Sequence, residues 1–286
     1  MIFGLLVTST FRDSTGNLDP VLYNAAHWDG VNWTVLRIPY YYLGQPFYSP
    51  IYSVFTFDEG NIWFGIGIMI HWDGQNYNPV QLPPGIWTPQ QMNKIWGKSD
   101  GSLYVVGEQG GIAFRSPTGS WQRVTSGTSL PIRHVLGMNN NSARFEVLGV
   151  SDSYGDPHGS EVLLIDGLSA RSAWNDGRPF GLDGIWFVPD RRYVAVGAGV
   201  WQTRSLESPW ALEHSPPHIT SIDGNQLNDY VIVGAFMHIS HFDGLNWHVL
   251  MSSSSGSLTS VQMRDDMFVT VGSSGPKPIA VRATRQ

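Results

Sequence analysis

The side chains best suited to chemistry recur in three copies of one short motif. The copies span residues 27–33, 71–77 and 241–247 and share the pattern His-aromatic-Asp-Gly-x-Asn-aromatic. An imidazole two residues from a carboxylate suits metal binding or acid–base catalysis. The copies begin 44 and 170 residues apart, so they belong to separate repeats and cannot converge on one ion. We therefore expect structural roles for His27, His71 and His241 and turn-forming roles for Asp29, Asp73 and Asp243.

A second group of ionisable residues lies in irregular segments. Glycoside hydrolysis needs two carboxylates about 5–10 Å apart, and four acids outside the repeats offer a pair: Asp152, Asp156, Asp176 and Asp183. The sequence contains no His-Glu-x-x-His zinc motif and no phosphate-binding loop. A glycoside hydrolase or lyase is therefore the alternative function, and no catalytic residue is assigned.

Aromatic residues accompany these acids in four long irregular segments, at residues 37–50, 83–89, 151–159 and 175–184. Aromatic faces stack on sugar C–H groups while polar groups hold hydroxyls, and the same mixture suits a protein surface. The predicted ligand-binding residues are Tyr40, Tyr41, Tyr42, Trp87, Asp152, Tyr154, Asp156, His158, Asp176, Arg178, Phe180 and Asp183.

Composition excludes several other chemistries. The chain has no cysteine, which rules out disulfides, thiolate metal sites and a thiol nucleophile. A net charge of −6 argues against nucleic acid and anionic membranes as partners. No apolar run approaches the roughly 18 residues that span a bilayer, and residues 1–7 are typical of a strand, not of a signal peptide. We expect no cofactor, no metal, no nucleic-acid partner and no membrane span.

The elements that position these residues follow from an internal repeat. Short β-rich runs end at Gly67, Gly107, Gly149, Gly197, Gly234 and Gly272, at intervals of 37 to 48 residues that average 41. Repeats of this length, built from short strands and Asp-Gly turns, indicate β-propeller blades. A chain of 286 residues holds about seven such units. We predict an all-β propeller of four-stranded antiparallel blades, seven in number with six as the alternative, in a single domain over residues 1–286.

Each unit has a strand assignment. An example of a first strand is residues 52–57, of a second strand residues 62–67, and of a fourth strand, in another unit, residues 33–36. The Asp-Gly turn joins the third strand to the fourth. Residues 2–36 supply a second, third and fourth strand, and residues 258–286 supply a first, second and third. We expect the ring to close by pairing of the two termini, because open edges invite aggregation. Tryptophans of the repeats are expected between blades: Trp33, Trp121, Trp210 and Trp247.

This topology places the long segments on one face. Connections from a fourth strand to the next first strand share a face with connections from a second strand to a third, and the Asp-Gly turns lie on the other face. All four long segments are connections of these two types, so all four lie on the face opposite the Asp-Gly turns. We call this side the long-loop face, and loops on a rigid scaffold are where function concentrates.

The Asp-Gly-x-x-Trp turns resemble the Asp-box (BNR) repeats of sialidase-type propellers and the seven-bladed photosystem II assembly-factor type. The Asp-box pattern is Ser-x-Asp-x-Gly-x-x-Trp, whereas here Asp29 and Gly30 are adjacent and His27 stands at the serine position. The resemblance implies a propeller over nearly the whole chain. Sialidases also need an arginine cluster for the substrate carboxylate, and none is assigned here.

These observations favour a non-catalytic binding or scaffolding propeller. We expect it to engage a glycan or a protein through the long-loop face, as a monomer, and to be secreted or periplasmic. Docking of a partner protein by an assembly factor is a third reading.

Overall fold

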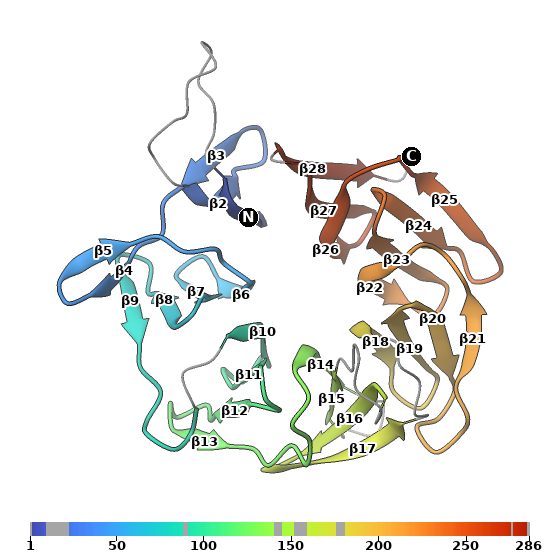
Figure 1. Cartoon of the computed structure of the whole chain (residues 1–286), viewed down its shortest axis with the longest axis horizontal. Coiled ribbons are helices and arrows are strands. Elements are labelled where there is room, and N and C mark those ends of the chain that lie inside the picture. Colours follow the sequence, from blue (N-terminus) through green and yellow to red (C-terminus); the bar gives the residue numbers. More distant parts are fainter. Residues whose placement is uncertain are drawn as a thin grey trace.

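The computed structural model describes residues 2–9, 23–87, 91–139, 145–151, 159–175, 181–275 and 277–284. All 28 regular elements of these residues are β-strands, which confirms the all-β class. Figure 1 shows their sheets arranged as a ring around a central opening. The part of the chain that the structure describes contains no helix that is long and apolar enough to cross a bilayer.

Five sheets are complete blades of four antiparallel strands, in which each strand pairs with the one that follows it in the chain. Their strands are β6(Ser53–Asp58), β7(Asn61–Gly65), β8(Met69–Trp72) and β9(Tyr77–Val80); β10(Met92–Gly97), β11(Leu103–Gly107), β12(Ile112–Arg115) and β13(Trp121–Arg123); β14(Ile132–Asn139), β15(Phe145–Ser151), β16(Glu161–Asp166) and β17(Ser169–Asn175); β18(Leu182–Val188), β19(Arg192–Gly197), β20(Gly199–Thr203) and β21(Ala211–His214); and β22(Ile219–Gln226), β23(Asp229–Gly234), β24(His238–Phe242) and β25(Trp247–Met251).

The two sheets at the ends of the chain have three strands each. They contain β1(Ile2–Ser9), β2(Tyr23–Trp28) and β3(Trp33–Leu36), and β26(Ser257–Arg264), β27(Met267–Ser274) and β28(Lys277–Thr284). The first sheet lacks an inner strand and the last lacks an outer one, as the sequence predicts. Counted together as one closing unit, they give a propeller of six blades of mostly four strands. The prediction of seven four-stranded blades is therefore corrected to the alternative of six.

The ring also closes differently from the prediction. Among the described strands, β1 forms a ladder only with β2, and β28 forms one only with β27. Strand β1 nevertheless lies against β27 and β28, so the two terminal sheets adjoin by packing. The described strands thus provide no terminal strand pairing.

The Asp-Gly turns form as the sequence predicts. In each motif copy one aspartate oxygen accepts two backbone N–H groups, and for Asp243 these belong to Leu245 at 2.8 Å and Asn246 at 2.7 Å. The following Gly244 has a φ of 99°, a left-handed conformation that glycine adopts without a Cβ clash. These backbone hydrogen bonds hold the pKa of the Asp243 carboxyl well below its usual range.

Aromatic packing between blades supplies much of the core. Trp186 of β18 stacks on Tyr230 of β23, with ring centroids 5.2 Å apart, and donates its indole N–H to the carbonyl of Gly224 at 3.0 Å. Trp210 stacks on Trp174 of the preceding blade at 4.7 Å. These pairs confirm that aromatic rings join neighbouring blades.

Three of the four expected tryptophans lie between blades. Trp121 contacts Trp63, Trp210 contacts Trp174, and Trp247 stacks on His214, each in the blade that precedes it. Trp33 differs, because it remains 40% exposed and contacts Trp28 of its own sheet. The sheet that precedes it around the propeller is β26–β28, which has no outer strand against which the Trp33 indole could pack.

Candidate functional site

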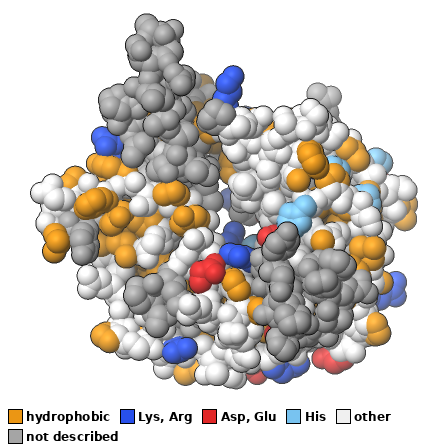
Figure 2. Space-filling model, in the orientation of Figure 1, with side chains coloured by type: hydrophobic (Ala, Val, Ile, Leu, Met, Phe, Trp, Pro, Cys, Tyr) orange, Lys and Arg blue, Asp and Glu red, His pale blue; other side chains and the backbone are white. Residues whose placement is uncertain are grey.

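The long-loop face carries the opening of the central channel. Figure 2 views the molecule from this side and shows basic, acidic and histidine side chains in and around a central opening. The inner strands lead into this opening with a recurring irregularity. In β10, β14, β18 and β22 the register shifts directly after the first paired residue, and in β26 it shifts after the second. The bulged residues are Asn93, Arg133, Asp183, Thr220 and Thr259.

Two polar groupings at these bulges are held by side-chain contacts. Glu108, directly after β11, accepts hydrogen bonds from Arg133 Nη1 at 2.9 Å and from Asn93 Nδ2 at 3.1 Å. On a separate blade, Asp183 Oδ2 lies 2.7 Å from His218 Nε2, and the His218 side chain is half-exposed. The channel entrance therefore combines a neutralised Glu–Arg pair with an Asp–His pair.

His218 also lines a recess of about 380 Å³ on the same face. The other lining residues are Ala198, Gly199, Trp201, Leu212, Ser215 and Pro216, and this set is mostly apolar. Trp201 donates its indole N–H to the Ala198 carbonyl at 3.2 Å and is only 5% exposed, so its ring is a buried part of the recess wall. A Cβ at Gly199 would lie 2.8 Å from Leu212 Cδ1, so the absence of a side chain there keeps room beside Leu212. The recess suits an apolar side chain, with an ionisable pair at its edge.

A short hairpin projects from the connection between β3 and β6. Its strands are β4(Tyr40–Tyr42) and β5(Gln45–Phe47), and they form a separate two-stranded sheet. Tyr41 is 53% exposed and Leu43 is 86% exposed. Hydrophobic side chains gather over this part of the face in Figure 2. The hairpin thus adds a second exposed apolar surface to the long-loop face.

The structure describes five of the twelve predicted ligand-binding residues at least in part. Tyr40 is half-buried and stacks on Phe47 with centroids 5.7 Å apart. Trp87 packs over Gly107, where an added Cβ would lie 2.9 Å from its ring. Tyr41 is exposed on the hairpin, only the backbone of Tyr42 is described, and Asp183 pairs with His218. Trp87 therefore has a packing role, whereas Tyr41 and Asp183 lie where a ligand can reach.

The other seven predicted residues lie outside the described residues: Asp152, Tyr154, Asp156, His158, Asp176, Arg178 and Phe180. Sequence reasoning missed Glu108, Arg133, His218, Trp201 and Leu212, which the structure brings to the channel entrance and the recess. Their position at bulges and short turns carries no sequence signal. Only the alignment of inner strands would have drawn attention to Arg133.

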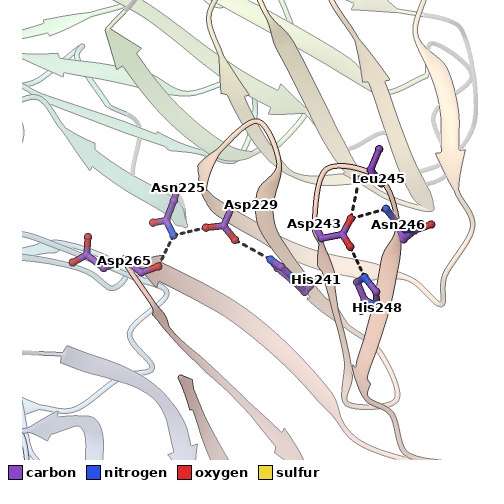
Figure 3. A network of polar contacts seen from close by, with 8 residues as sticks. All are labelled: Asn225, Asp229, His241, Asp243, Leu245, Asn246, His248 and Asp265. Atoms are coloured by element: carbon purple, nitrogen blue, oxygen red, sulfur yellow. Dashed lines mark hydrogen bonds and ion pairs between the residues drawn. The ribbon is translucent and has the colours of Figure 1, made fainter. Parts of the chain in front are cut away.

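The motif histidines occupy separate sites, as the sequence predicts. His71 Nε2 lies 2.9 Å from Asn61 Oδ1, and His241 Nε2 lies 2.8 Å from Asp229 Oδ1. Asn61 and Asp229 each begin the second strand of their blade. Figure 3 shows the second site, in which Asn225 bridges Asp229 and the Asp265 carbonyl, while the neighbouring Asp243 holds its own turn. No group of three or more His, Asp or Glu side chains that could hold a metal ion occurs among the described residues.

A second recess, of about 350 Å³, lies on the opposite face between turns of two blades. Its lining residues are Asp190, Arg191, Arg192, Arg204 and Leu227. Arg192 has a structural task, because it donates to the Leu227 carbonyl at 3.1 Å and to the Tyr230 hydroxyl at 3.3 Å. This recess is basic, unlike the apolar recess on the long-loop face.

The sheets and their ring define the chain as a β-propeller. Its fold is similar to YCF48, a photosystem II assembly factor solved bound to D1 peptide, with a TM-score of 0.66, 20% identity, and coverage of 100% of this chain and 97% of that one.

Two further solved propellers are similar. The computationally designed Ika8 protein gives a TM-score of 0.58 at 16% identity, over 82% of this chain and 72% of that one. The calcium-binding protein regucalcin from Agrobacterium tumefaciens C58 gives 0.52 at 10% identity, over 78% and 83%. No family model and no curated protein matches the sequence. At these identities the comparisons establish the fold alone.

Proposed function

We propose that this chain is a non-catalytic binding propeller that holds a segment of a partner protein on its long-loop face. The observation that carries the proposal is the apolar recess beside the Asp183–His218 pair at the channel entrance. The similarity to a propeller solved with a bound peptide supports the same reading.

The character of the recess favours a protein segment over a glycan. A sugar needs several polar groups around its hydroxyls, whereas Trp201, Leu212 and Pro216 offer mainly carbon. Such a surface receives an aromatic or branched side chain, and burial of that side chain supplies the affinity. The His218–Asp183 pair at the edge supplies a polar partner for the backbone of the segment.

The alternative of a glycoside hydrolase or lyase gains no support from the described residues. Of its four candidate carboxylates, only Asp183 is described, and its Oδ2 is bound to His218 at 2.7 Å. The other three lie outside the described residues. We therefore do not propose turnover of a glycoside.

The test is a selection of binding peptides from a phage-displayed library, followed by affinity measurement with a recess variant. Leu212 is 49% exposed, so Leu212→Lys should leave the fold intact while placing a charge in the apolar recess. We expect the selected peptides to lose at least about tenfold in affinity, because one buried apolar side chain contributes roughly 1.5–3 kcal/mol.

Leu245→Lys is the matched control, because Leu245 is 88% exposed at an Asp-Gly turn on the opposite face. This variant should bind as tightly as the wild type. Equal affinities for all three proteins, or loss of binding in the control alone, would rule out the recess as the binding site.

A further inference from the structure

The inner strands share one position at which a serine joins neighbouring blades in two cases. Ser53 accepts a hydrogen bond from Ile95 N in the next blade at 2.9 Å, and Ser221 accepts one from Val261 N at 3.2 Å. In β10, β14 and β22 this position directly follows the register shift and pairs with a valine of the second strand. It is held by Lys94 in β10 and by His134 in β14.

Neither replacement reproduces the role of serine. A lysine ammonium has no acceptor and cannot receive the N–H of the next blade. Among the described residues, no hydrogen bond or ion pair reaches the Lys94 ammonium. The Nδ1 of His134 is buried and also has no hydrogen-bond partner within this part of the chain. Two neighbouring blades thus each have a side-chain nitrogen that makes no hydrogen bond to the described residues.

Lys94 is half-buried on β10, an inner strand of the ring beside the central opening. It interacts electrostatically with Asp223 of β22, although sheets β14–β17 and β18–β21 lie between their blades around the ring. An interaction between such distant blades passes across the channel. Basic and acidic side chains are visible in the central opening in Figure 2.

Asp223 does not neutralise Lys94 by contact, because its carboxylate is already engaged. Its Oδ2 accepts from Gln262 Nε2 at 2.6 Å and from Met263 N at 2.8 Å, and its Oδ1 accepts from Gly224 N at 2.9 Å.

Burial lowers the pKa of Lys94, and burial together with the Lys94 charge lowers the pKa of His134 well below its usual value. Burial raises the pKa of Asp223 to about 6. Lys94 is half-buried, and its ammonium has no contact partner among the described residues, so it can donate to an anion.

We propose that Lys94 and His134 form a binding site for a single carboxylate group inside the channel. A carboxylate has two acceptor oxygens, which match an ammonium and an imidazole N–H on adjacent blades. Its single negative charge balances Lys94, and Asp223 repels one negative charge less strongly than the two charges of a phosphate dianion. The group belongs either to a free small carboxylate or to the C-terminus of a bound segment.

The test uses acetate as the probe. We expect acetate to bind saturably in NMR titrations at constant ionic strength and to raise the melting temperature of the wild type. Lys94→Met should weaken acetate binding at least about tenfold, because hydrogen bonds to charged groups are worth roughly 1.5–3 kcal/mol. Lys98→Met is the matched control, since Lys98 is a surface lysine paired with Asp100 at 3.1 Å.

The melting temperature separates a binding role from a structural one. Without acetate, Lys94→Met should melt no lower than the wild type, because it removes a half-buried charge that has no contact partner among the described residues. A lower melting temperature in acetate-free buffer, no saturable acetate response in the wild type, or an equal response in Lys94→Met would each overturn the proposal.

Two further arms identify the source of the carboxylate. If a C-terminus is the ligand, peptides with a free C-terminus should bind more tightly than acetate and than their amidated forms, and Lys94→Met should abolish that preference. If the ligand is a small molecule, acetate should bind as tightly as the free-terminus peptides. This test is independent of the test of the recess. Library peptides displayed at a phage protein's N-terminus have no free C-terminus, so they probe the recess alone.

Discussion

The glycines that end the second strands show how single residues fix the geometry of a blade. A Cβ at Gly234 would lie 2.1 Å from the carbonyl oxygen of His218, and one at Gly197 would lie 2.1 Å from that of Gly181. The chain that enters an inner strand thus crosses directly over the end of the second strand. The His218 carbonyl also accepts the N–H of Ala235 at 2.8 Å, so this close approach helps to place His218 beside the recess.

Gly234→Ala is predicted to destabilise the protein by roughly 1–3 kcal/mol or more, because the backbone must shift to admit the methyl group. Urea unfolding followed by tryptophan fluorescence measures the change. Gly149→Ala is the matched control, because its nearest neighbours would lie 3.4 Å from the new Cβ, an ordinary contact. Similar unfolding free energies for the two variants would contradict the close approach of the His218 carbonyl to Gly234.

Sequence reasoning identified these glycines as landmarks but did not distinguish among them. At Gly67 an added Cβ would meet nothing within 4 Å, whereas at Gly272 it would lie 2.1 Å from the Ser257 carbonyl. Periodicity shows where a repeat recurs, but a close approach depends on the path of a second segment. For the same reason His218 could not be recognised in advance, because its role depends on Asp183 in the preceding blade.

At the scale of elements, neighbouring blades are joined by polar contacts as well as by aromatic rings. Asp229 begins β23 and receives His241 Nε2 at 2.8 Å and Asn225 Nδ2 at 2.9 Å. Asn225 also donates to the Asp265 carbonyl at 2.7 Å, at the turn between β26 and β27 (Figure 3). The motif histidine thus supports a link between the last complete blade and the C-terminal sheet.

Asp229→Ala should lower the free energy of unfolding by about 1–3 kcal/mol, because it removes a buried carboxylate that holds the partly buried His241 imidazole and the Asn225 amide. Asp265→Asn is the control, since the network uses only the backbone carbonyl of Asp265 and its side chain is 87% exposed. Thermal unfolding followed by circular dichroism compares the variants. An unchanged melting temperature for Asp229→Ala would show that the link contributes nothing to stability.

At the scale of the whole molecule, the account depends on which face receives the partner. The repeat interval and the Asp-Gly turns predicted the strands and the two faces, because each depends on local sequence. Blade number and ring closure could not be predicted, because they depend on how the three-stranded terminal sheets meet. The recess could not be predicted either, because Trp201 and Pro216 belong to different strands and loops and meet only through folding.

The most direct test of binding on the long-loop face is hydrogen–deuterium exchange with and without a peptide selected from the library. We predict slower exchange on peptide addition at residues 198–201 and 211–218, which surround the recess, and unchanged exchange at the Asp-Gly turn of residues 243–247 on the opposite face. Protection confined to the Asp-Gly turns, with none around the recess, would contradict the account.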